Sequence, residues 1–237
     1  SDGLPMDWID VPFGPFFPGL PSGLLLTLTL DGDTVAGSSA RTLTENVALP
    51  HHSALEPLSF VARLSNMEPL APLAYRFLAN QAMENAAGIE ITTVTARGRV
   101  GALERERITS HLGWLALFGL GFKAISRDSG DSLARLQVRL DEICQSLALI
   151  DAAGAIEPPE PTDIGSATGT GEALVETPRG AARLQLTLEN GRVVTAQLET
   201  PSTQHLTLID ALIEQQSLGD ALLAVGSLDL SPWEIRQ

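Results

Sequence analysis

Apolar residues recur at intervals of three and four along the middle of the chain, which is the period of an amphipathic helix. The first such stretch, residues 55–87, is broken near Glu68–Pro69 and Pro72. It closes at Gly88, a typical helix-stop glycine. A second helix is predicted over residues 100–118. Together these patterns predict a helical bundle in the centre of the chain.

A third helix is predicted over residues 131–151. Its apolar positions follow the spacing 3, 4, 3, 4, 3, which indicates a helix-packing seam rather than a set of ligands. The seam consists of Leu133, Leu136, Leu140, Ile143, Leu147 and Ile150. Gly154 ends this helix, and the proline-rich segment 157–161 predicts a stiff linker after it.

The two ends of the chain carry the alternating pattern of β-strands. Residues 24–30 alternate up to Asp31–Gly32, and Val35 begins the return strand. Residues 184–198 alternate on both sides of Asn190–Gly191, a strong hairpin signal. We therefore expect an α+β fold, a helical bundle with one small antiparallel sheet formed by the N-terminal and C-terminal hairpins.

A single domain over residues 1–237 accommodates all of these elements. Residues 1–50 would form an N-terminal loop and hairpin, and residues 54–154 the helical bundle. Residues 168–237 would form the β-hairpin region and a C-terminal helix that starts at His205.

Composition narrows the function classes. The formal net charge is −14 and Lys123 is the only lysine, which argues against binding to nucleic acid or to an anionic membrane. The chain shows neither an apolar run of membrane-spanning length nor a signal peptide, so a cytoplasmic protein without direct membrane insertion is expected.

The potential metal ligands are few. The only cysteine, Cys144, excludes an internal disulfide and any cysteine-rich metal site, and its apolar surroundings predict a buried structural thiol. His51–His52 lacks the spacing of a ligand pair and fits an exposed loop better than a metal site.

A polar stripe runs along the second predicted helix. Glu104, Arg107 and His111 stand at i, i+3 and i+7 and therefore share one face. Glu104 and His111 could act as catalytic acid and base. A buried network that joins helices, with partners such as Glu176 and Arg179, is the favoured interpretation.

Four segments carry a family resemblance. Residues 104–115 resemble a helix with the pattern Glu-Leu-x-Arg-Ile-x-Ser-His-Leu-x-Trp-Leu, and residues 171–180 resemble a Gly-x-Val-Glu-Ala-Pro-Arg-Gly turn. Residues 14–32 are similar to an N-terminal hairpin, and residues 200–235 to a closing segment that ends in Ser-Leu-Asp. The chain thereby resembles the 49-kDa subunit of respiratory complex I and the large subunit of nickel-iron hydrogenases, as a shortened and cysteine-depleted member.

The resemblance implies a hydrogenase large-subunit-like fold without the chemistry of that family. In complex I the N-terminal loop holds a quinone-contacting histidine in a Gly-Pro-Gln-His-Pro pattern, where this chain has Phe16 and Phe17. The cysteine motifs that hold nickel and iron are missing. We therefore expect no catalytic residue, no metal and no cofactor, and a remnant of the partner or quinone site at Phe16, Phe17, His205 and Asp229.

Three functions remain open. The favoured one is a catalytically degenerate homologue that acts as a non-metal accessory subunit or assembly scaffold of a redox complex. Its partner would be an iron-sulfur small subunit or a hydrogenase or complex I assembly component, contacted through the apolar N-terminal loop. The alternatives are a working oxidoreductase subunit that binds quinone by other residues, and an unrelated small-molecule or protein-binding module.

Overall fold

The computed structural model describes residues 7–43, 49, 54–118 and 131–235, so His51–His52 and Lys123 lie outside the described residues. The chain divides into two compact units. The first comprises residues 1–45, 117–138 and 202–237, and the second comprises residues 46–116 and 139–201.

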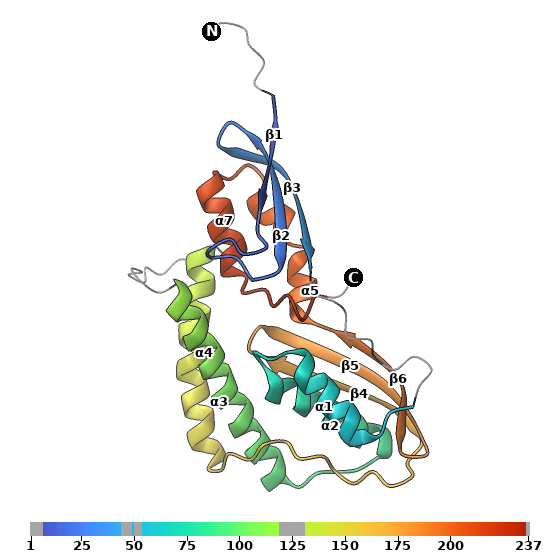
Figure 1. Ribbon diagram of the computed structural model, residues 1–237. Helices are drawn as coiled ribbons and strands as arrows, with labels where there is room; N and C mark the ends of the chain where they lie inside the picture. The colour runs from blue at the N-terminus through green and yellow to red at the C-terminus, as the bar shows by residue number, and fades with distance from the viewer. Residues whose placement is uncertain (1–6, 44–48, 50–53, 119–130, 236–237) are drawn as a thin grey trace, which may run out of the picture. The chain divides into compact units, whose positions relative to one another are not determined.

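The first unit is built on an antiparallel sheet with the strand order β1-β2-β3 (Figure 1). The strands are β1 (Ile9–Phe13), β2 (Leu24–Asp31) and β3 (Thr34–Thr42). Leucine at every second position of β2 gives that strand one buried face, as the alternation predicts. The same core contains residues of the short helices α5 (Pro201–Leu206), α6 (Ile209–Ile213) and α7 (Leu218–Ser227).

The second unit contains the sheet β4-β5-β6, made of β4 (Gly169–Thr177), β5 (Gly180–Glu189) and β6 (Arg192–Glu199). Asn190 and Gly191 both adopt positive φ angles, as the predicted hairpin turn requires. Helices α1 (Pro57–Met67) and α2 (Pro72–Ala87) share a core with this sheet.

Helix α2 lies very close to β4. A Cβ atom at Gly171 would stand 2.1 Å from the Ala82 carbonyl oxygen, so only glycine permits this approach. The helix ends at Gly88, whose φ of 67° places it in the left-handed conformation expected of a helix-stop glycine.

Helices α3 (Thr93–Phe118) and α4 (Ser132–Ala153) lie side by side (Figure 1). Helix α3 begins earlier than the apolar periodicity predicts. The hydroxyl of Thr92 accepts a hydrogen bond from the Thr95 backbone N–H and caps the helix, and the first turns carry too few apolar residues to be recognised by their spacing.

The α+β class is confirmed, but the expectation of one combined sheet is wrong. The N-terminal and C-terminal hairpins each recruit a third strand and form separate sheets, β1-β2-β3 and β4-β5-β6. Alternation specifies which face of a strand is buried but not which strand it pairs with.

The expectation of a buried Cys144 is also wrong, because this side chain is exposed on α4. Of the predicted α4 seam only Leu136 is buried, and its other members are half-buried or exposed. Within the described ranges, every helix is too short or too polar to cross a lipid bilayer.

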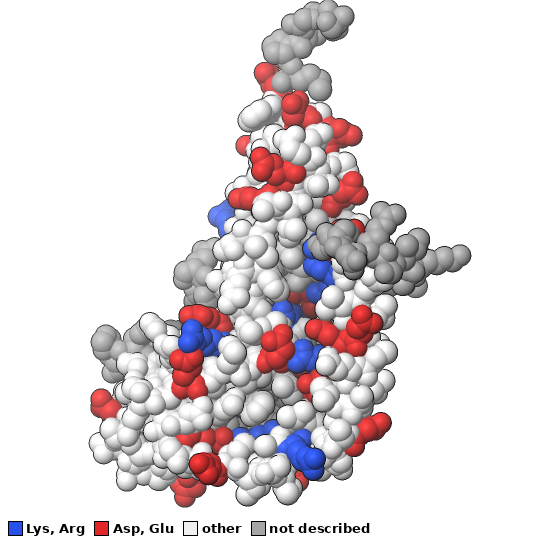
Figure 2. Space-filling model, turned by 180° about the vertical axis from the view of Figure 1, so that it is seen from behind, with Lys and Arg blue, Asp and Glu red and all other residues white. Residues whose placement is uncertain are grey.

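The charge distribution follows the acidic composition. Asp10, Asp31 and Asp33 are exposed on or beside the first sheet, and Figure 2 shows acidic side chains gathered there with few basic ones among them. This surface lacks the basic character that nucleic-acid binding needs.

Candidate functional site

Helix α3 buries several charged side chains beside its apolar ones. The buried polar and charged side chains include Arg99, Glu104, Glu106, Arg107 and His111. A charged group buried in this way is tolerated only when it is paired and hydrogen-bonded. Their partners therefore decide what the polar stripe can do.

Arg107 is held by three acceptors. Its Nε donates to Glu104 Oε2 at 3.0 Å, while its two terminal nitrogens donate to the backbone carbonyls of Thr177 at 3.0 Å and Glu176 at 2.7 Å. These carbonyls belong to the end of β4. The planar guanidinium thus joins α3 to the strand, using the fork geometry that only arginine offers.

Glu104 extends the contact to α4. The hydroxyl of Ser146 donates to the same Glu104 Oε2 atom at 2.6 Å. One carboxylate oxygen therefore accepts from both an α3 and an α4 side chain. Helices α3 and α4 and strand β4 meet at this point.

His111 belongs to a second contact between α3 and α4. Its Nε2 lies 2.6 Å from Glu142 Oε2, and one turn away the Arg139 guanidinium lies 4.3 Å from the centre of the Trp114 ring. Burial opposes ionisation of Glu142, but the hydrogen bond and charge of His111, with Arg107 and Arg139 nearby, lower the pKa of this carboxyl overall. The His111 Nδ1 atom has no hydrogen-bond partner among the described residues.

Glu106 caps helix α2 from outside. Its two carboxylate oxygens accept from the backbone N–H groups of Leu73 and Ala74 at 2.7 and 2.8 Å. The residue before the helix, Ala71, has no side chain that could do this. Burial raises the pKa of Glu106, although the two backbone hydrogen bonds and the charges of Arg179 and Arg107 act in the opposite direction.

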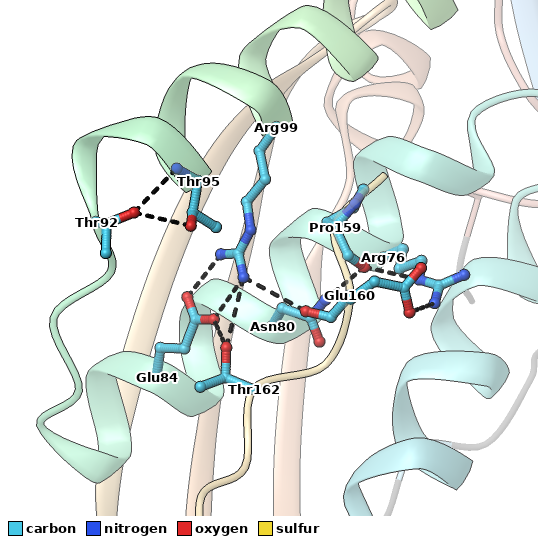
Figure 3. Close-up of polar contacts among 9 residues, drawn as sticks. All are labelled: Arg76, Asn80, Glu84, Thr92, Thr95, Arg99, Pro159, Glu160 and Thr162. Carbon is cyan, nitrogen blue, oxygen red and sulfur yellow. Dashed lines mark hydrogen bonds and ion pairs between the residues drawn. The ribbon is translucent and has the colours of Figure 1, made fainter. Parts of the chain in front are cut away.

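A second polar cluster fixes the proline-rich segment that follows α4 (Figure 3). Arg99 donates to both oxygens of Glu84 at 2.8 and 2.7 Å, and the Thr162 hydroxyl also donates to Glu84. Arg76 and Asn80 of α2 both donate to the Pro159 carbonyl, at 2.8 and 2.9 Å. The predicted linker is therefore anchored to α2 and α3.

The predicted burial of Glu104, Arg107 and His111 and the predicted link to Glu176 are confirmed. His111 bonds to Glu142 rather than to the other two stripe residues, and Arg179 lies 3.9 Å from Glu68 instead. Sequence reasoning missed Glu106, Glu142 and Ser146. The lack of a capping side chain before Pro72, the first residue of α2, was the available signal for Glu106. The sequence offered no such signal for Glu142 and Ser146.

The remaining candidate residues lie on three segments of the first unit. Phe16 is 81% exposed in the loop between β1 and β2, and Phe17 is 37% exposed with its ring edge-on to Phe13 at 5.0 Å. His205 is half-buried in α5. Asp229 is half-buried after α7, with a positive φ of 54°.

A buried serine–glutamate pair ties the C-terminal segment of this unit together. Both the backbone N–H and the hydroxyl of Ser202 donate to Glu234, at 3.2 and 2.5 Å. The Ser231 N–H donates in turn to the Ser202 hydroxyl at 2.9 Å. Glu234 is fully buried, so this arrangement stabilises the closing segment.

No protein-family model matches the chain, but individual relatives do. It is 35% identical over 109 residues to the D subunit of the NADH-quinone oxidoreductase of Desulfotalea psychrophila, covering 43% of this chain and 29% of that protein. It is 32% identical over 120 residues to the corresponding protein of Campylobacter jejuni, covering 48% of this chain and 28% of that protein. The chain thus matches less than a third of these relatives' length.

The fold also has a solved counterpart. A chain of the membrane-bound sulfane sulfur reductase, an archaeal respiratory membrane complex, superimposes with a TM-score of 0.82 at 15% identity. The match covers 98% of this chain and 99% of that one. The predicted resemblance to the complex I subunit and the hydrogenase-like fold class are both confirmed.

Proposed function

We propose that this chain is a subunit of a respiratory oxidoreductase complex, in which it serves as a non-metal accessory subunit or assembly scaffold. Similarity to NADH-quinone oxidoreductase subunits and the fold shared with a chain of a respiratory membrane complex support the first part of this proposal.

The hydrogen bonds made by the polar stripe are the observation that supports the accessory role. Glu104 and Arg107 direct their hydrogen bonds to Ser146 and to strand carbonyls. Two hollows in the second unit, of about 570 and 700 Å³, are lined by other residues: one by the outer face of the sheet, the other by loops around Asp163 and Arg192. The stripe thus serves to join elements of the fold.

The chain's composition supports the same role. A nickel-iron centre needs several thiolates, because these soft ligands select such metals. Cys144 alone cannot supply them. The redox centres of the complex would then reside in other subunits.

The exposed Phe16 marks the surface through which a protein partner would be held. An apolar side chain this exposed contributes little to the stability of the fold, and its burial by a partner would be favourable. The proposed partner is an iron-sulfur small subunit or an assembly component of such a complex. A cytoplasmic location, bound to the complex rather than inserted in the membrane, is part of the same proposal.

Affinity purification of the full chain from its native cell, in mild detergent, tests this function. We expect co-purification with iron-sulfur subunits of one respiratory complex, and loss of those subunits with Phe16→Ser. Trp8→Ser removes another exposed aromatic ring of the same unit and should leave binding unchanged. A chain that migrates at its own mass, without redox subunits, would contradict the proposal.

A further inference from the structure

The α4 packing seam is only partly covered within the described residues. The row formed by Leu136, Ile143 and Ile150 is buried or half-buried. In the second row Leu133 is half-buried, whereas Leu140 is 37% and Leu147 is 54% exposed, and Cys144 lies exposed between these two. A 3-4 spacing is the signature of packing against another helix, so the exposed row has the shape of a helix-docking surface.

The charges that flank this row are acidic. Asp141 and Asp151 are exposed beside it, whereas Arg139, the nearest basic residue, is buried against Trp114. Charges that flank an apolar helical seam select the partner by sign. The complementary helix would carry lysine or arginine at its flanking positions.

We propose that Leu140, Cys144 and Leu147, which form an apolar stripe on α4 distinct from the polar stripe of α3, are the docking surface for one amphipathic helix of a partner subunit. That helix has leucine or isoleucine at 3-4 spacing and basic flanks. The inference rests on the proposed function and assigns a second contact surface, separate from the loop that contains Phe16.

A second copy of this chain is the less suitable occupant. It would bring its own Asp141 and Asp151 against the same residues, and each copy carries a formal net charge of −14. Like charges beside a helix seam destabilise the pair. The stripe therefore fits a heterologous, basic helix.

Cys144 provides a direct reporter, because it is the only cysteine of the chain and lies within the stripe. We would measure its alkylation by N-ethylmaleimide in the isolated chain, with and without a synthetic peptide of about three Leu/Ile heptads flanked by lysine. At peptide concentrations well above Kd, alkylation should slow by about tenfold. A peptide of the same heptads flanked by glutamate should leave the rate unchanged.

The variant Leu140→Glu with Leu147→Glu should abolish this protection, while Leu58→Glu, at a 68% exposed position of α1, should keep it. Both variants replace exposed leucines, and circular dichroism would verify that each retains its helices. Equal protection by the two peptides, or protection that survives in the double variant, would overturn the inference.

The same reporter applies to the complex purified from the native cell. Alkylation of Cys144 should again slow by about tenfold there, and a photo-crosslinker on Cys144 should capture a basic helix of another subunit. If redox subunits co-purify while Cys144 reacts at its free rate, the docking surface is wrong and the proposed function stands. A crosslink to a second copy of this chain would also overturn it. If the lysine peptide protects Cys144 but no redox subunit co-purifies, the surface stands and the proposed function fails.

Discussion

Arg107 shows why a buried charge can stabilise this fold. Removing a guanidinium from water is costly, and the cost is offset only when the group is paired with a counter-charge and hydrogen-bonded with good geometry. Arg107 meets this condition with one carboxylate and two carbonyls at the end of β4. The carbonyls at the end of an edge strand are thereby protected from pairing with another chain.

Arg107→Ala should lower the free energy of unfolding by roughly 3–5 kcal/mol, because it leaves the buried Glu104 without its counter-charge. Urea denaturation followed by circular dichroism measures this. Arg183→Ala is the control. It breaks an exposed, solvent-screened pair with Glu172 and should change the free energy of unfolding far less than Arg107→Ala does. An Arg107→Ala protein as stable as the wild type would refute the network.

Glu142 should make stability depend on acid pH. Its pKa is lowered in the folded state, below the ordinary value of 4.5, so its contribution is present above pH 4.5 and is lost as the pH falls through the lowered pKa. The pKa of Glu106 is raised in the folded state, so its contribution to stability has the opposite pH dependence: it is present at low pH and is lost as the pH rises above 4.5.

The difference in unfolding free energy between the wild type and Glu142→Gln should therefore be greatest at neutral pH and shrink as the pH falls below 4.5. Denaturation at a series of pH values measures it. Glu90→Gln, at an exposed position, is the matched control. A difference that stays constant from neutral to acid pH would contradict the role given to the His111–Glu142 pair.

At the scale of elements, glycines on α3 determine where the proline-rich segment lies. A Cβ at Gly101 would stand 2.5 Å from the Ala155 carbonyl oxygen, and one at Gly98 would stand 2.8 Å from the Glu157 Cβ. Contacts this close leave no room for a side chain. The segment is thus packed directly on the helix backbone.

Gly101→Ala should destabilise the protein by roughly 1–3 kcal/mol, because the segment must move away from α3. Gly113→Ala, on the same helix, meets no atom within 4 Å and should stabilise it by about 0.5–1 kcal/mol. Chemical denaturation of both variants gives the comparison. If the two substitutions changed stability in the same direction, the close packing would be refuted.

Sequence predicts those features that depend on local spacing. The helices, the hairpins and the charged face of α3 follow from period and turn chemistry. Pairs distant in sequence, such as His111 with Glu142 or Ser202 with Glu234, leave no local pattern. The α4 seam shows a further limit, because spacing identifies a packing face without telling which molecule covers it.

At the scale of the whole molecule, the chain shares its fold over nearly its full length with one respiratory-complex chain, yet matches under a third of the length of its curated relatives. The sequence similarity to these relatives covers only that part of their length, and the chain carries no cysteine-rich motif. The function proposed for the chain is therefore one of assembly.

Purified chain should contain no nickel, iron or zinc in stoichiometric amount, since a single cysteine cannot supply a thiolate site. Elemental analysis by mass spectrometry, before and after treatment with a chelator, measures this. One tightly held metal ion per chain would contradict the non-metal role.

The most direct measurement compares the amount and the turnover of assembled complex in cells that carry Glu104→Gln or His111→Gln. If the polar stripe is structural, these variants reduce the amount of complex, and electron-transfer turnover per assembled complex stays unchanged. Normal assembly with turnover per complex reduced by about 10²-fold or more would show that the polar stripe is catalytic, and would contradict the accessory role.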